Sequence, residues 1–200
     1  MNVFSDEEGQ IAVNIARRVI DSAVRNENPG VIEILTSLKD HGGVFTTISK
    51  YPSNNLRSCI GYSEPVMPII SAIIRSAKSA ASRDMRFRPV REDELNNIVI
   101  SVSLLTKPSR LLYDDPSDLP HLVKIGTHGL IIRKGEKAGL LLPQVPIEQG
   151  WDSEVFLNQV CVKAGLPYKT WKAGKADLFT FTAEVFEEEE PRGTVVRKPM

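Results

Sequence analysis

Cysteine is scarce in this sequence of 200 residues, which contains only Cys59 and Cys161. Secreted domains held together by disulfides usually carry more, so the count favours a reducing, cytoplasmic compartment. The three histidines, His41, His121 and His128, are scattered and do not combine with the cysteines into zinc-site spacing. We therefore predict no metal site and no cofactor.

The sequence also lacks an excess of charge of either sign, because 25 Lys and Arg residues balance 25 Asp and Glu residues. This balance argues against a nucleic-acid binder that relies on bulk positive charge, although a local basic patch is compatible with it. The longest apolar-rich segment, residues 66–81, is interrupted by Arg75 and Lys78 and does not predict a membrane span. Residues 1–6 show no signal-peptide pattern.

Repeats, low-complexity linkers, a glycine-rich phosphate loop and a G-x-S-x-G elbow are missing as well. Apolar residues make up 42% of the chain and charged residues 25%, which is typical of a protein with a buried core. We predict a single domain over residues 1–200, with room for a smaller second lobe.

Three helices are predicted. Ser5-Asp6-Glu7-Glu8 reads as a capping box that starts a helix ending near Arg25. Glu64-Pro65 is expected to open the second, because proline is well placed in a first helical turn. Asp152 or Ser153 is expected to cap the third, which ends before Gly165. Each carries an apolar stripe at helical spacing.

Several segments bounded by turn residues have the composition or the alternation of strands. The segment 98–105 alternates most clearly, with apolar residues on one face and Ser101 and Ser103 on the other. The remaining predicted strands are 44–48, 56–61, 130–132, 139–143 and 178–186, and residues 31–40 are predicted as a loop or short helical turn. Short connections favour antiparallel pairing, so the class is α+β: a largely antiparallel sheet of five or more strands flanked by helices.

The last predicted strand is followed by an acidic run, Glu187–Glu190. Runs of like charge usually face solvent, and we interpret this one as a solvated end of the chain rather than an interaction motif.

One segment, Leu56–Gly61, combines an apolar strand pattern with a cation, a hydroxyl and a thiol. A second unusual segment, residues 82–90, crowds three arginines and Asp84 around Met85 and Phe87. Together with several other motifs, these segments resemble the AMMECR domain family. The matching runs are Gly43–Thr47, Leu56–Gly61, Ala80–Val90, Val102–Leu105, Gly126–Leu130, Leu142–Pro146, Gly150–Asp152 and Cys161–Leu166.

The resemblance covers nearly the whole chain and implies an α+β domain of two lobes without an established reaction. It also implies an association with Memo-like proteins and radical-SAM enzymes as partners. Two positions depart from the family pattern. Ser58 replaces a usual glycine, and Ser101 replaces a glutamate that many members carry. The first departure argues against a glycine-only backbone conformation there, and the second removes a possible acid or base.

The candidate site is built around Cys59. Residues two apart on a strand share a face, so Arg57 and Cys59 are expected on one surface, where a cation favours a thiolate. Cys59 is then a catalytic nucleophile, a ligand contact or a buried core residue. The apolar stripe of the third helix assigns Cys161 to the core.

Arg57 and Arg86 provide paired N–H donors for a carboxylate or phosphate, or form internal salt bridges, with Asp84 as the expected partner. Ser58, Asp84 and Lys163 complete the predicted ligand-binding set. His128 is a candidate acid or base, or a structural turn residue.

Three functions remain open from the sequence. The first is binding or modification of a small anionic ligand in a cleft around Arg57, Cys59 and Arg86. The second is a protein-interaction scaffold, and the third is RNA binding through the arginine cluster, which the neutral formal charge disfavours.

Overall fold

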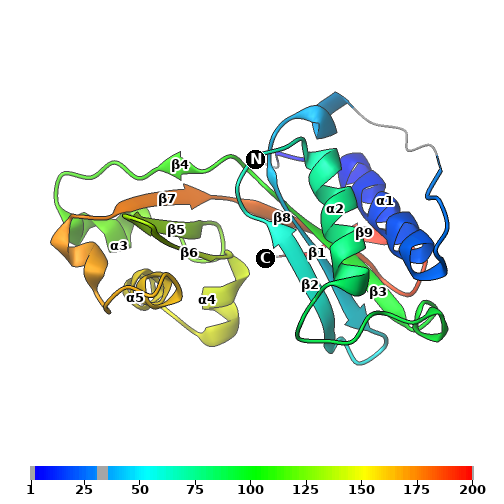
Figure 1. The fold of residues 1–200 in the computed structure, drawn as a ribbon. Coiled ribbons are helices and arrows are strands. Elements are labelled where there is room, and N and C mark those ends of the chain that lie inside the picture. The colour runs from blue at the N-terminus through cyan, green and yellow to red at the C-terminus, as the bar shows by residue number, and fades with distance from the viewer. Residues whose placement is uncertain (1–2, 31–35, 200) are drawn as a thin grey trace. The chain divides into compact units, whose positions relative to one another are not determined.

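The computed structural model describes residues 3–30 and 36–199. Within these residues the chain divides into two compact units (Figure 1). The first contains the chain up to Leu105 together with Glu184–Pro199, and the second contains Thr106–Ala183. Each unit has its own sheet and its own helices, in keeping with the predicted α+β class. No described helix combines the length and apolar character that crossing a bilayer requires.

The first unit is built on a five-stranded sheet with the order β2-β1-β3-β8-β9. Strand β1 pairs antiparallel with both β2 and β3, and β8 pairs antiparallel with β9. Apolar residues of α1, α2 and the sheet form one buried core, with the two helices on the same side of the sheet. The strands are β1 (Gly43–Lys50), β2 (Leu56–Tyr62), β3 (Ile98–Leu105), β8 (Ala183–Glu188) and β9 (Val195–Arg197).

Helix α1 (Asp6–Arg25) confirms the prediction at its start and at its end. The Ser5 hydroxyl accepts the Glu8 amide at 3.1 Å, and the Ser5 amide donates to the Glu8 carboxylate, which completes the capping box. The left-handed residue Asn26 caps the other end. The acidic first turn and Arg25 in the last turn both suit the helix dipole.

Helix α2 (Ile69–Ser82) begins later than predicted. The prediction that Pro65 opens it is wrong, because a second proline, Pro68, would then lie inside the helix without an amide to donate. Pro68 instead has an extended ψ of 141° and forms an isolated bridge with His41. The Ile69 amide donates to the Asp40 carbonyl at 2.8 Å, so the segment before α2 is tied to the start of β1.

Strand β3 has the predicted bounds, but its second face is not open to solvent. All eight of its residues are buried, including Ser101 and Ser103. Two short 3₁₀ helices belong to this unit: η1 (Thr36–Lys39) precedes β1, and η2 (Glu92–Glu94) follows α2. Residues 31–35 of the predicted loop lie outside the described residues.

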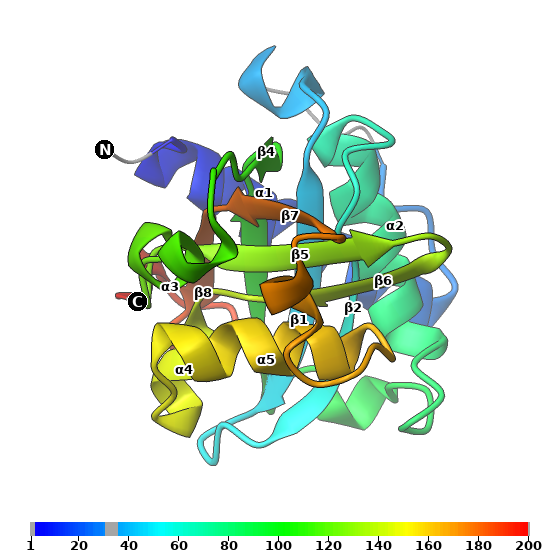
Figure 2. The same ribbon diagram turned by 90° about the vertical axis from the view of Figure 1, so that its left-hand side faces the viewer.

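The second unit has a four-stranded sheet with the order β4-β7-β5-β6. Apolar residues of α5 (Ser153–Lys163) pack on one face of it, and Figure 2 shows α5 alongside β5 and β6. Asp152 caps α5 as predicted, accepting the Val155 amide at 2.8 Å. The other elements are β4 (Ser109–Arg110), β5 (Gly129–Lys134), β6 (Lys137–Leu141), β7 (Asp177–Phe181), α3 (Leu119–Leu122), α4 (Gln144–Gln149), η3 (Pro116–Asp118) and η4 (Thr170–Ala173).

The predicted strand 178–186 is two strands that belong to different sheets. It breaks at Thr182, between β7 and β8. The Thr182 amide donates to the Thr106 hydroxyl at 2.9 Å, and the Thr106 amide donates to the Thr182 carbonyl at 2.9 Å. The unbroken apolar alternation gave no signal of this change of sheet.

The interpretation of Glu187–Glu190 as a solvated end is wrong for its first half. Glu187 and Glu188 lie in β8, and the Glu188 side chain is buried. The Arg17 guanidinium donates to both Glu188 oxygens, and the Ile100 amide donates to one of them at 3.0 Å. Local sequence could not reveal this pair, because Arg17 lies on α1 at the opposite end of the chain.

Candidate functional site

Strand β2 is an edge strand of the first sheet, and its outer backbone groups are bound by side chains instead of another strand. The Cys59 amide donates to Oδ2 of Asp84 at 3.0 Å. The Cys59 carbonyl accepts from Nη2 of Arg86 at 3.0 Å. Asp84 and Arg86 follow α2 directly, so the loop after the helix covers the edge of β2.

The Asp84 carboxylate is the centre of this arrangement. It is buried and also accepts the Ser58 hydroxyl at 3.1 Å, the Arg86 amide at 3.2 Å and two guanidinium bonds from Arg86 at 2.9 and 2.8 Å. The Arg86 guanidinium holds the pKa of the Asp84 carboxyl well below its usual range, aided by the backbone and hydroxyl donors and opposed by burial. The same pair raises the pKa of Arg86.

Ser58, the first departure from the family pattern, is fully buried. Its backbone does not need the conformation that favours glycine, since it is not among the described non-glycine residues with positive φ. Its hydroxyl donates to Asp84, so the substitution adds one bond to the carboxylate. A glycine is required three positions later, because a Cβ at Gly61 would lie 2.3 Å from the Phe45 ring.

Arg57 does not follow the strand alternation that we expected. Ile48 is paired with Ser58 and Ser49 with Leu56, so Arg57 is the extra residue of a β-bulge. Its guanidinium donates to the Glu94 carboxylate at 2.7 and 3.0 Å and to the Pro89 carbonyl at 3.2 Å. The bulge redirects this side chain from the expected surface with Cys59 to η2.

The pair of Arg57 and Glu94 is largely removed from solvent, with side-chain exposures of 9% and 24%. The Arg57 guanidinium lowers the pKa of Glu94, as does the Arg91 amide, while burial opposes both. Sequence reasoning named Asp84 as the expected partner and missed Glu94. The available signal was the run of three acidic residues in η2, which lies three residues before the apolar strand β3.

The Cys59 thiol is half-buried and accepts a hydrogen bond from the Thr47 hydroxyl at 3.2 Å. Thr47 lies opposite Cys59 on β2 and opposite Ser101 on β3, so the three residues form one row across the sheet. Ser101, the second departure from the family pattern, therefore lies in the same row as the thiol. It offers a hydroxyl where many family members are expected to have a carboxylate.

The outer surface of the loop after α2 exposes a methionine between arginines. Met85 is 100% exposed, and Arg83 and Arg88 are exposed on either side of it. The Arg86 guanidinium lies over the Phe87 ring, 5.5 Å from its centroid. The Phe87 amide donates to the Asp84 carbonyl at 3.0 Å, so the loop turns tightly around the carboxylate. Sequence reasoning did not assign Met85 a role.

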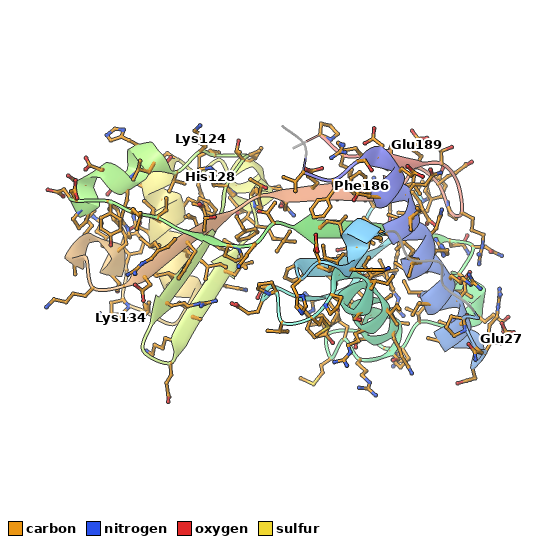
Figure 3. All side chains as sticks on the ribbon, turned by 90° about the horizontal axis from the view of Figure 1, so that it is seen from above. Glu27, Lys124, His128, Lys134, Phe186 and Glu189 are labelled. Carbon is orange, nitrogen blue, oxygen red and sulfur yellow. The ribbon has the colours of Figure 1, made fainter. Side chains whose placement is uncertain are left out.

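His128, Lys163 and Cys161 belong to the second unit. His128 lies beside Lys124, whose amide donates to its Nδ1 at 3.3 Å (Figure 3). Burial lowers the pKa of His128, and the charge of Lys124 adds to this effect. Lys163 is exposed at the end of α5. Cys161 is fully buried, as predicted, and burial raises the pKa of its thiol.

Within residues 3–30 and 36–199, no group of three or more His, Cys, Asp or Glu side chains is arranged to hold a metal ion. Around β2, the first unit offers the ion pairs Asp84–Arg86 and Arg57–Glu94, a half-buried thiol and an exposed loop.

Comparison with known proteins identifies relatives along the whole chain. A Thermococcus onnurineus protein is 48% identical over 204 residues, covering 98% of each chain. A Methanocaldococcus jannaschii protein is 42% identical over 200 residues and covers all of both chains. The crystal structure of an uncharacterized Pyrococcus horikoshii protein is similar, with a TM-score of 0.89, 42% identity and coverage of 98% of this chain and 99% of that one.

The pattern of the AMMECR1 family matches residues 13–186, which include the second sheet, strands β1, β2 and β3 of the first sheet, and the whole candidate site. This match agrees with the motifs that carried the resemblance in the sequence. The chain belongs to the AMMECR1 family.

Proposed function

We propose that this AMMECR1-family chain is a binding module that docks an acidic protein surface through the loop of residues 83–88. The single observation that carries the proposal is the exposure of Met85 on a loop that the buried Asp84 carboxylate holds against β2. Methionine and arginine are both enriched at protein interfaces, and methionine adapts its shape to a partner's apolar pocket.

The anchoring of the loop supports binding because it reduces the conformational entropy lost on association. Asp84 bonds to Ser58 and Cys59 on β2 and to Arg86 in the loop itself, so the loop is held against the sheet edge. The Val90 amide donates to the Ala81 carbonyl at 2.8 Å and closes the loop at its far end. A preorganised loop of this kind needs little rearrangement to bind.

The charge of the loop selects the partner. Arg83, Arg86 and Arg88 lie within six residues, and the acid among them, Asp84, is buried beneath the surface. The side chain of Arg86 is 56% exposed although it is bound to Asp84. The surface presented to a partner is therefore cationic around an apolar centre, which complements an acidic rim around an apolar pocket.

The anionic-ligand hypothesis around Arg57, Cys59 and Arg86 has weaker support. Both guanidinium groups donate pairs of bonds to carboxylates of the same chain, Glu94 and Asp84. A small anion would have to compete with these partners, which are already held in place. RNA binding is also less favoured, because the neutral formal charge of the chain provides little long-range attraction for a phosphate backbone.

The proposal is tested with two defined partners that the family resemblance suggests, a Memo-like protein and a radical-SAM enzyme from the same genome. Titration calorimetry should detect a complex with one of them at micromolar concentration. Met85→Glu should weaken it about tenfold or more, because a buried anchor becomes a charge. Cys59→Ala should leave the affinity unchanged, whereas the anionic-ligand hypothesis expects this variant to lose binding.

The matched control is Val66→Glu. Val66 is also an exposed apolar residue of the first unit, at 68%, and it precedes α2 whereas Met85 follows it. The 14 residues of α2 separate the two positions by about 20 Å. Equal weakening by both variants, or no complex with either partner at micromolar concentration, would contradict the proposal.

A further inference from the structure

The second unit contains a polar hollow of about 770 Å³ at one end of its sheet. It is lined by the segment after β4, by the turn between β5 and β6, and by the segment that leads into β7. We propose that this hollow binds a small phosphate-bearing molecule. The inference goes beyond the docking function above, because it concerns the other unit of the chain and a different class of ligand.

Cationic side chains dominate the lining. Arg110, Arg133, Lys134 and Lys175 face two carboxylates, Asp114 and Asp177. Figure 3 shows Lys134 at one end of β5, with His128 beyond the other end. Because positive groups outnumber negative ones in a single hollow, the electrostatic potential there favours an anion.

Internal pairing removes one charge of each sign and leaves the cations in excess. Asp177 forms a salt bridge with Arg110 and lies opposite Arg133 on the neighbouring strand. The Arg133 guanidinium also lies over the Phe179 ring, 5.0 Å from its centroid. These contacts occupy Asp177 and fix the positions of two arginines at the wall of the hollow.

The two lysines remain available. Lys134 and Lys175 are exposed, and neither has an ion-pair partner among the residues that the structure describes. They come from different segments, the end of β5 and the approach to β7, and line the same hollow. Lysine ammonium groups are well suited to phosphate oxygens, which accept hydrogen bonds from several directions.

Backbone geometry leaves open space beside Gly135, which also lines the hollow. Gly135 has a φ of +58°, and a Cβ built on it would meet nothing within 4 Å. The volume lies within the range of small-molecule sites and exceeds what inorganic phosphate alone would fill. A ligand with an organic part and one or more phosphate groups therefore fits better than a bare ion.

A smaller hollow in the first unit provides a contrast. It has a volume of about 360 Å³, and its charged lining residues are Lys50, Asp93 and Glu94. Carboxylates outnumber cations there, and Glu94 is already paired with Arg57. The physical argument for an anion therefore applies to the hollow of the second unit and not to this one.

The experiment uses the full chain and titration calorimetry with pyrophosphate and with ATP at low and physiological salt. Binding of either in the millimolar range or tighter is expected. Lys134→Ala combined with Lys175→Ala should weaken it about tenfold or more, because two charge-assisted contacts are lost. Asp114→Asn should tighten it a few-fold, since a carboxylate facing the ligand becomes neutral.

Lys163→Ala is the matched control. It removes an exposed lysine of the same unit from α5, which packs on the opposite face of the sheet from Arg133 and Phe179. Unchanged affinity in this variant is expected. No binding at millimolar concentration, or equal loss in the control, would overturn the proposal. Tighter binding of a short single-stranded RNA, with a steep salt dependence, would also overturn it in favour of a nucleic-acid surface.

Discussion

The Cys59 amide donates to the Asp84 carboxylate at 3.0 Å, at the outer edge of the first sheet. With the Arg86 bond to the Cys59 carbonyl, both edge-facing backbone groups of this residue are satisfied by side chains. Unpaired edge groups invite pairing with other chains, and charged side chains are one way in which proteins prevent it. The cluster that the sequence suggested as a ligand site thus has a structural role that is visible in its contacts.

Asp84→Asn should destabilise the first unit by about 2 kcal/mol. The change weakens bonds from Ser58, Cys59 and Arg86 to an ionised acceptor, and such bonds contribute more than neutral ones. Urea unfolding followed by circular dichroism measures the loss. Arg86→Gln should cost less, because its side chain is 56% exposed and solvent screens its charge. A larger effect of Arg86→Gln would contradict this ranking.

Stability should fall at acidic pH in a way that depends on Asp84. Its folded-state pKa is lowered by Arg86, so the unfolded chain takes up a proton at higher pH than the folded chain does. The stabilisation is therefore present above the unfolded pKa, near 4, and is lost as the pH falls below it. The difference in urea midpoint between the wild type and Asp84→Asn should be smaller at pH 3 than at pH 7. A difference that stays constant with pH would exclude this linkage.

Local signals predicted much of this architecture. The capping box of α1, the bounds of β3 and the Asp152 cap of α5 are each set by residues within a few positions of one another. The prolines before α2 were also informative, but the prediction started the helix at Pro65. The second proline, Pro68, decides where α2 begins.

Features that depend on distant partners were not predictable. The bulge at Arg57 is a property of its pairing with β1, and Glu94 meets Arg57 across 37 positions of sequence. The change of sheet at Thr182 depends on Thr106, 76 positions away. In the site, the segment of residues 82–90 correctly predicted that Asp84 pairs with Arg86. Two residues of one tight loop are close to each other independently of the rest of the fold.

A double-mutant cycle should show strong coupling between Arg57 and Glu94. Arg57→Met and Glu94→Gln should each destabilise the chain, and the double variant should cost less than their sum by about 1 kcal/mol or more. The reason is that each single variant leaves a partly buried charge without its partner. Urea unfolding of the four proteins gives the coupling. Additive losses would restore Arg57 as a candidate for binding an external anion.

Glu188→Gln should cost about 3 kcal/mol or more, because it leaves the buried Arg17 guanidinium without its counter-charge. The carboxylate also accepts the Ile100 amide, so the change affects α1, β3 and β8 together. Glu189→Gln is the matched control, since Glu189 is the exposed neighbour in the same acidic run. Its effect should stay within about 0.5 kcal/mol. Equal losses would mean that the run acts through its total charge and not through this pair.

Thiol labelling separates the roles left open for Cys59. In the folded chain, iodoacetamide at pH 7 should modify Cys59, which is half-buried, and spare Cys161, which is fully buried with a raised pKa. Both should react once the chain is unfolded in urea. Cys59→Ser should abolish the native-state reaction, which mass spectrometry measures directly. Because Arg57 is directed to Glu94 and Arg86 to Asp84, we expect Cys59 to react more slowly than a free thiol. A faster rate would show an activated nucleophile and would favour catalysis over docking as the role of this segment.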